Sequence, residues 1–234
     1  SVVTWGSTTG GGDSSSVSDQ LSSGVRQLFT TESAFAALKD DGSVVTWGNL
    51  DEGGDSTSVS DLIQSGVTSI HPTDSAFAAI KEDGSIVTWG HALYGGDSEP
   101  VASKLTEVKH IFSNPHAFAA LKENGSIVTW GQQYYGGNTS NIYGLRSNIK
   151  HVYATDYAFA ALKNDGSVIT WGRPEYGGYT GSSTSATSEK LKSDVVDIIS
   201  TKKAFAALKK DGSVVTWGDD DWGGDSSSAS AGLQ

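Results

Sequence analysis

The sequence contains no cysteine and no methionine among its 234 residues. Without cysteine, the chain can form neither a disulfide nor a zinc–thiolate site, so its stability must come from packing. Methionine is missing from the first position as well, and we therefore expect the chain to be a piece of a longer protein. The sequence shows no cofactor-binding motif, and we predict no cofactor.

Basic residues are also in short supply. The chain has 16 Lys and Arg against 27 Asp and Glu, which gives a formal net charge of −11 at pH 7. Such a chain repels the phosphates of nucleic acid and of anionic lipid, so we expect no nucleic-acid partner. Hydrophobic runs are short. None approaches the roughly 20 apolar residues that span a membrane, and we predict no membrane insertion.

Repetition is what the sequence has in abundance. The hexapeptide Ser-Val-Val-Thr-Trp-Gly opens the chain at Ser1, and close copies begin at Ser43, Ser85, Ser126, Ser167 and Ser213. Successive copies start 41 to 46 residues apart, a period typical of propellers and repeat arrays. We therefore treat residues 1–234 as a single repeat domain.

A second block precedes five of the six hexapeptides. It reads Ala-Phe-Ala-Ala-Leu-Lys or nearly so, and it begins at Ala34, Ala76, Ala117, Ala158 and Ala204. A short turn of Asp or Asn followed by Gly joins the two blocks, which predicts a β-hairpin. A third short strand is expected ten residues before each Phe, as at Val25–Leu28. The Ser-rich segments ahead of these strands predict a helical or 3₁₀ turn, with Val59 and Leu62 facing inward in one of them.

The predicted fold is all-β. Three strands and a turn bury too little apolar area to be stable alone, so we expect each unit to pack against its neighbours. The hexapeptide tryptophans could be packing wedges between sheets or stacking platforms for ligands, and large rings in small repeats favour packing. These residues are Trp5, Trp47, Trp89, Trp130, Trp171 and Trp217.

One stretch, SAFAAIKEDGSIVTWGHALYGGDS beginning at Ser75, resembles the repeat of the regulator of chromosome condensation family. The resemblance recurs in five units, covers most of the chain, and implies a β-propeller, which in that family usually has seven blades. Five complete units and one leading strand predict five or six blades here, with an open curved β-repeat array as the alternative.

The chain also departs from that family. It has Ala34 and its equivalents where the family often has His, and it writes Gly-Gly-Asp-Ser where the family has Gly-Gln-Leu-Gly. Nucleotide exchange on a small GTPase and nucleosome binding are therefore not carried over to this chain.

The loops after each Trp-Gly pair carry the candidate binding residues. Their first residues vary while their Gly-Gly ends stay constant, as in binding loops on a fixed frame. Four of them place an aromatic residue at one equivalent position: Tyr94, Tyr135, Tyr176 and Trp222. The candidate carboxylates, Asp55, Asp97 and Asp225, stand just after the glycines. An aromatic face beside a carboxylate could bind a sugar; alternatively, the ring packs on its glycines and the Asp caps the next turn.

Metal binding and catalysis find less support. Asn138 and Tyr179 replace the Asp in two units, and no Ca²⁺-loop spacing occurs, so we predict no metal site. The five histidines do not recur at one shared place, and neither a nucleophile elbow nor a phosphate-binding loop is present. We therefore expect no catalytic residues and no enzyme.

Two functions remain open. The first is a recognition module that displays repeated loop sites for a carbohydrate or a protein. The second is a structural stalk, filament or scaffold segment of a longer repetitive protein. Both allow the chain to be part of a larger assembly, and an extracellular or cell-surface location is favoured.

Overall fold

The computed structural model describes residues 1–140, 142–179 and 186–227. The architecture is all-β, as predicted: five antiparallel sheets of three strands follow one another along the chain, and consecutive strands are neighbours in each sheet. We call these sheets with their following loops units 1 to 5. The five blade-like units confirm tandem propeller repeats.

The strands match the predicted blocks. In units 1 and 2 they are β1 (Val25–Thr30), β2 (Ala34–Lys39), β3 (Val44–Gly48), β4 (Val67–Pro72), β5 (Ala76–Lys81) and β6 (Ile86–Gly90). In units 3 to 5 they are β7 (Val108–Asn114), β8 (Ala117–Lys122), β9 (Ile127–Gly131), β10 (Ile149–Ala154), β11 (Ala158–Lys163), β12 (Val168–Gly172), β13 (Val195–Ser200), β14 (Ala204–Lys209) and β15 (Val214–Gly218).

Helical segments are short and lie between the sheets. The two α-helical turns are α1 (Ser18–Leu21) and α2 (Ala186–Lys190). The 3₁₀ segments are Thr8–Gly10, Ser15–Val17, Leu50–Glu52, Thr57–Leu62, Ala92–Tyr94, Glu99–Lys104, Gln133–Tyr135, Tyr143–Arg146, Pro174–Tyr176 and Asp220–Trp222. The predicted turn around Val59 is therefore present. Leu62 is exposed, however, and the buried residue is Ile63, which follows the end of the 3₁₀ segment and has a non-helical φ of −108° and ψ of 11°.

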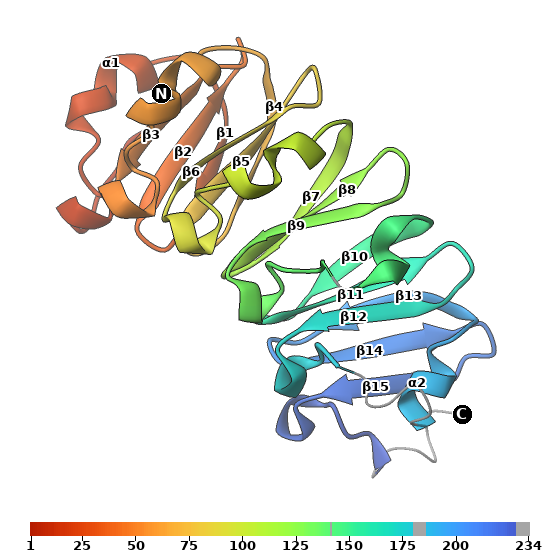
Figure 1. Cartoon of the computed structure of the whole chain (residues 1–234). Coiled ribbons are helices and arrows are strands. Elements are labelled where there is room, and N and C mark those ends of the chain that lie inside the picture. Colours follow the sequence, from red (N-terminus) through yellow and green to blue (C-terminus); the bar gives the residue numbers. More distant parts are fainter. Residues whose placement is uncertain (141, 180–185, 228–234) are drawn as a thin grey trace.

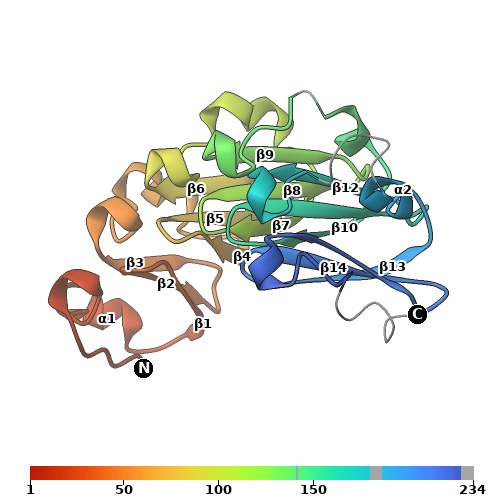
Figure 2. The ribbon, with the colours of Figure 1, turned by 90° about the horizontal axis from the view of Figure 1, so that it is seen from below.

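The five units lie along an arc (Figures 1 and 2), with unit 1 at one end and unit 5 at the other. The first strand of each unit lies beside the first strand of the next, as β1 does beside β4 and β10 beside β13. These first strands form the inner side of the arc. The arrangement is the open curved one, and the number of blades is five.

The segment at Ser1 does not become a sixth blade. Residues 1–6 have the hexapeptide sequence but form no strand, and the Trp5 side chain is 84% exposed. The other five hexapeptide tryptophans are between 2% and 4% exposed. Instead of pairing with a strand, the Val2 backbone N–H donates to the Leu21 carbonyl (3.1 Å).

Each hairpin is fixed by its turn. In unit 1, Asp41 Oδ1 accepts hydrogen bonds from the Ser43 backbone N–H (2.9 Å) and from Ser43 Oγ (2.6 Å). Gly42 between them has a φ of 77°, which residues other than glycine rarely adopt. Asn124 makes the same pair of bonds to Ser126 in unit 3. The turn therefore needs the acceptor oxygen and the glycine, not the negative charge.

The hydrophobic core lies between units. One cluster joins Ala36 and Leu38 of β2 to Phe77 of β5 and Trp89 of β6, and equivalent clusters join each later pair of units. In unit 1 a further cluster joins Ala37, Val45 and Trp47 to Leu21 ahead of the sheet. The apolar faces are thus buried between units, as the sequence predicts.

Each buried tryptophan clamps its unit to the loop before it. In unit 3, Trp130 Nε1 donates to the Gly95 carbonyl of the preceding loop (3.0 Å), and the ring stacks on Phe118 with centroids 5.0 Å apart. The same bond, 3.0 to 3.1 Å long, is made by Trp47, Trp89, Trp171 and Trp217. The prediction that these rings serve packing is confirmed for all but Trp5.

The glycine at the end of the clamp leaves no room for a side chain. A Cβ on Gly136 would lie 2.6 Å from Cδ2 of Phe159, and its φ of 107° is already unfavourable for other residues. Gly223 holds the equivalent position after unit 5, with a φ of 100°, but a Cβ there would meet nothing within 4 Å. Both glycines have a positive φ, but only at Gly136 would an added Cβ collide with a neighbouring side chain.

We predict that Gly136→Ala lowers the free energy of unfolding by about 1–3 kcal/mol more than Gly223→Ala does. Both variants place a Cβ at positive φ, so this cost cancels in the comparison. Only Gly136→Ala must displace the buried Phe159 ring. Urea denaturation followed by tryptophan fluorescence measures the difference, and equal losses in the two variants would show that Phe159 is not tightly seated.

Candidate functional site

The loops after the third strands are held in place by the inner turns of their own units. The carbonyl of Tyr94 accepts a hydrogen bond from Thr73 Oγ1 (3.1 Å), and that of Tyr135 accepts one from Asn114 Nδ2 (2.8 Å). Tyr176 and Trp222 accept the equivalent bond from a threonine in units 4 and 5. These bonds place each predicted aromatic residue directly over the turn between the first and second strands.

The aromatic side chains meet across units instead of forming separate sites. His116, just before β8, lies between Tyr94 of the preceding unit (centroids 5.4 Å apart) and Tyr135 of its own unit (4.9 Å). Tyr157, just before β11, contacts Tyr135 (4.7 Å) and Tyr176 (4.5 Å). With His91 and Trp222 at its two ends, we call this set the aromatic row: His91, Tyr94, His116, Tyr135, Tyr157, Tyr176 and Trp222.

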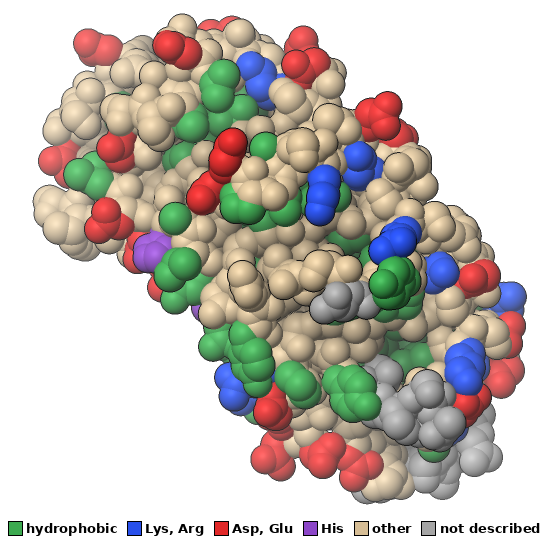
Figure 3. Space-filling view, viewed as in Figure 1, with side chains coloured by type: hydrophobic (Ala, Val, Ile, Leu, Met, Phe, Trp, Pro, Cys, Tyr) green, Lys and Arg blue, Asp and Glu red, His purple; other side chains and the backbone are tan. Residues whose placement is uncertain are grey.

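Cationic side chains continue the row through units 4 and 5. Arg173 lies over the Tyr176 ring, with Cζ 5.1 Å from its centroid. Lys203, just before β14, places Nζ 5.5 Å from the Tyr176 centroid and 4.8 Å from the Trp222 centroid, so it connects the two rings. Figure 3 shows hydrophobic side chains and a histidine along the edge where the 3₁₀ loops of successive units lie.

Sequence reasoning missed His116, Tyr157 and Lys203. They occupy one equivalent position, directly before the second strand, which holds Ser33 and Ser75 in units 1 and 2. The sequence does show a variable position directly before the constant Ala-Phe block. That position did not indicate a binding site, because it holds an aromatic residue in only two of the five units.

Acidic side chains lie beneath the row. Glu32 of unit 1, Asp74 of unit 2 and Asp156 of unit 4 line a hollow of about 330 Å³ together with Tyr94 and His116. Burial, with the nearby negative charges of Glu32 and Asp156, raises the pKa of Asp74. The acidic hollow therefore extends along units 1 to 4.

The cations at the far end of the row have acidic partners of their own. Arg173 pairs with Glu175 (3.1 Å), and Lys203 pairs with Asp219 (4.0 Å).

Burial also shifts the titration of the row itself. It lowers the pKa of His116, against the opposing influence of Asp156 and Glu32, and so favours the neutral imidazole. Burial raises the pKa of Tyr157, and the neighbouring Tyr176 and Asp156 add to that effect. The central rings are accordingly neutral near pH 7.

The three predicted aspartates cap the segments that follow them. The backbone N–H of Thr57 donates to Asp55 Oδ1 (2.8 Å), Glu99 N–H donates to Asp97 Oδ1 (2.9 Å), and Ser227 N–H donates to Asp225 Oδ1 (2.8 Å). These bonds lower the pKa of Asp55 and of Asp225. Each carboxylate thus already accepts a backbone hydrogen bond that holds its own loop.

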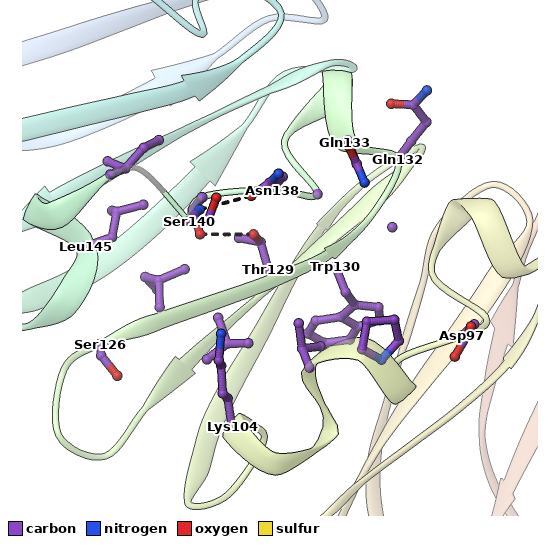
Figure 4. A pocket seen from close by; sticks show the side chains of 18 of the residues that line it. Asp97, Lys104, Ser126, Thr129, Trp130, Gln132, Gln133, Asn138, Ser140 and Leu145 are labelled. Atoms are coloured by element: carbon purple, nitrogen blue, oxygen red, sulfur yellow. Dashed lines mark hydrogen bonds between the residues drawn. The ribbon is translucent and has the colours of Figure 1, made fainter.

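Asp97 and Tyr94 line two different hollows. Asp97 lines a groove of about 1270 Å³ beside β9, whereas Tyr94 lines the acidic hollow under the row. Figure 4 shows the groove, in which Thr129 Oγ1 and Thr139 Oγ1 are 3.1 Å apart and hold the following loop against β9. In unit 2 the structure does not join the aromatic residue and the following Asp into one site.

A second row of polar and aromatic side chains lies on the inner strands. Phe112 contacts His151 (centroids 4.8 Å apart), and His151 contacts Tyr153, whose hydroxyl donates to Asp197 Oδ1 (2.8 Å). Burial and this bond raise the pKa of Tyr153 to about 12. At the other end of the same side, burial and the nearby His110 lower the pKa of His71 to about 4.

Among the residues that the structure describes, no group of three or more His, Asp or Glu side chains is placed to hold a metal ion. No helix in those residues is both long and apolar enough to cross a membrane.

Comparison with known proteins shows the fold. No protein-family model and no curated protein matches the chain. Among solved structures, yeast RCC1 (Prp20) bound to Kap60 matches with a TM-score of 0.53 and 18% identity, over 83% of this chain and 56% of that one. The entire ectodomain of the Physcomitrella patens receptor kinase CR4 matches with a TM-score of 0.53 and 17% identity, over 83% and 52%.

These likenesses support an RCC1-like propeller fold. At 17–18% identity they show the fold and not a shared activity. The chain spans about half the length of these two structures, which agrees with its arrangement as an open arc.

We predict that acid destabilises the protein through His71. The unfolded imidazole takes up a proton near its ordinary pKa of 6.5, whereas the folded one does so only near 4. The free energy of unfolding should therefore fall by up to about 3 kcal/mol as the pH drops from 6.5 to 4. Urea denaturation at a series of pH values tests this, and His71→Gln should flatten the decline over that interval. An unchanged slope in the variant would contradict it.

Proposed function

We propose that the chain is a non-enzymatic recognition module that binds an extended protein segment along the aromatic row. The observation that carries this proposal is the continuity of the row. Half-buried rings from three successive units, units 2 to 4, contact one another, where the sequence alone predicted several separate weak sites. Rigid, partly buried aromatic side chains are typical anchors of protein interfaces.

The acidic hollow beneath the row supports a partner that carries a basic side chain. Asp74 and Asp156 fit such a side chain, which the neighbouring rings would further stabilise. Arg173 and Lys203 already pair with Glu175 and Asp219, so they do not call for an acidic residue in the partner. A segment with a basic residue among its hydrophobic ones would match the row.

The similar structures agree with a protein partner. Yeast Prp20 is seen in complex with Kap60, and a second crystal structure of Prp20p from Saccharomyces cerevisiae concerns its binding properties to Gsp1p and histones. Those partners belong to that protein. They support the class of function and do not identify the partner of this chain.

A carbohydrate is the less favoured ligand. A sugar stacks on an open ring face, but His116 lies against the Tyr157 ring at an interplanar angle of 21°, and both also contact Tyr135. The carboxylates expected beside the rings cap turns instead. The row offers edges and hydrogen-bonding tips, which suit peptide groups better.

The test uses a random-peptide display library selected on the whole chain, followed by affinity measurement of the recovered peptides by fluorescence anisotropy. We predict that the double variant Tyr135→Ala, Tyr157→Ala weakens their binding at least about tenfold, because it removes two central anchors. Tyr143→Ala is the matched control: Tyr143 is exposed, lies outside the row, and pairs with Arg146. Circular dichroism verifies that all variants fold.

Two results would contradict the proposal. One is that the double variant and the Tyr143→Ala control bind the recovered peptides as tightly as the wild type. The other is a glycan array on which the wild type binds strongly, the double variant does not, and the peptide selection yields nothing. The second result would assign the aromatic row to a carbohydrate ligand instead.

The second candidate function, a structural stalk, filament or scaffold segment of a longer repetitive protein, stays a prediction. The extracellular or cell-surface location stays a prediction.

A further inference from the structure

The outer edge of β9, the third strand of unit 3, faces the groove of about 1270 Å³. At the start of the β8–β9 pair, the Lys122 N–H donates to the Ser126 carbonyl (2.9 Å). Because hydrogen-bonded residues alternate along an antiparallel pair, Ile127 and Thr129 direct their backbone N–H and C=O groups away from β8. Both residues line the groove.

Two other units bond this edge to their own chain. The Val44 N–H of β3 donates to the Ile63 carbonyl, and the Val168 N–H of β12 donates to the Leu191 carbonyl, each at 2.9 Å. Ile127 is the equivalent residue of β9. In the part of the chain that the structure describes, no carbonyl outside the sheet accepts its N–H. An unpaired strand edge is a template for a further strand.

Unit 3 also lacks two negative charges that other units carry around their third strands. Asn124 occupies the position of the hairpin aspartates, which are Asp41, Asp83, Asp165 and Asp211. Asn138 occupies the position of the loop aspartates, which are Asp55, Asp97 and Asp225. Both asparagines keep the turn bond: Asn124 Oδ1 accepts from the Ser126 N–H, and Asn138 Oδ1 accepts from the Ser140 N–H, each at 3.0 Å. The turns are therefore preserved while their charge is absent.

Three cationic side chains line the groove: Lys104, Lys122 and Arg146. Among the described residues, no acidic side chain forms an ion pair with any of them. In unit 4, by contrast, Lys163 occupies the position of Lys122, and its Nζ lies 4.0 Å from Asp165 Oδ2. The groove is thus cationic in a chain whose net charge is −11.

The contacts that these cations do make leave their charge in place. Lys122 Nζ donates to Thr106 Oγ1 (3.2 Å), and Arg146 Cζ lies 4.2 Å from the centroid of the Tyr143 ring. Asp97 is the one carboxylate among the described residues that line the groove, and Figure 4 shows it at the opposite end from Ser126. An acidic ligand would therefore be attracted to the end where β9 begins.

We propose that the outer edge of β9 binds an extended acidic segment of a partner protein, which joins unit 3 as a fourth strand. Its backbone bonds to the outward N–H and C=O groups of Ile127 and Thr129, and alternate side chains enter the groove. Acidic side chains among these meet Lys104, Lys122 and Arg146. A strand edge presents donors and acceptors at the spacing of a peptide backbone, which favours a protein ligand. This site is separate from the aromatic row and does not depend on it.

The test begins with a variant in which the aromatic row is disabled by Tyr135→Ala and Tyr157→Ala. A random-peptide display library is selected on the whole chain carrying these two changes, and fluorescence anisotropy measures the affinity of the recovered peptides. We expect peptides rich in Asp and Glu. Methylation of alternate backbone nitrogens in these peptides should abolish binding, because it removes the N–H groups that pair with the strand.

Charge reversal at the groove tests where the peptides bind. We expect Lys104→Glu combined with Arg146→Glu to weaken their binding at least about tenfold. Lys109→Glu combined with Lys150→Glu is the matched control, because it reverses two exposed lysines outside the groove and changes the net charge equally. The control should bind nearly as tightly as the starting chain.

Hydrogen exchange distinguishes strand pairing from a purely ionic contact. A bound peptide should slow exchange of the Ile127 N–H at least about tenfold, as followed by NMR. The Val44 N–H, which is already bonded to the Ile63 carbonyl, should be unaffected.

Four results would overturn the inference: a selection that yields no peptides, recovered peptides without acidic residues, equal weakening in the two charge-reversed variants, or unchanged exchange at Ile127 in the complex. Because the row is disabled from the start, none of these results bears on the proposed function. Loss of peptide binding through the row, in turn, would leave this inference standing.

Discussion

The structure depends on one contact repeated from unit to unit: a phenylalanine ring seated on a glycine of the preceding loop, with a tryptophan N–H bonded to that glycine's carbonyl. In unit 3 these residues are Phe118, Gly95 and Trp130. The glycine must lack a side chain so that the ring can approach, and its positive φ turns the carbonyl toward the indole. The bond satisfies two buried polar groups that would otherwise be costly, so the hydrophobic contact and the hydrogen bond reinforce each other. Because the contact joins neighbours only, stability accumulates along the arc.

The same contact explains why the aromatic row exists. It fixes the Gly-Gly end of every loop, and a threonine or asparagine in the inner turn fixes the carbonyl of the residue before it. The side chain at that position is then free to vary without disturbing the core, yet it always projects to the same place. In units 2 to 5 the position is aromatic, and with His116 and Tyr157 the rings come within contact distance. A repeated frame has thus converted scattered loop residues into one surface.

The sequence was informative where a residue has the same task in every unit. Strand blocks, Asp-Gly turns and packing tryptophans recur at a fixed period, and each was predicted correctly except at Trp5. The sequence was uninformative where the role of a residue depends on side chains of a neighbouring unit in the folded structure. His116 and Tyr157 gain their role only from rings of other units, and Trp5 is exposed because residues 1–6 form no strand despite their hexapeptide sequence. Likewise, the carboxylates near the row come from inner turns, such as Asp74, and not from the loops that carry the rings.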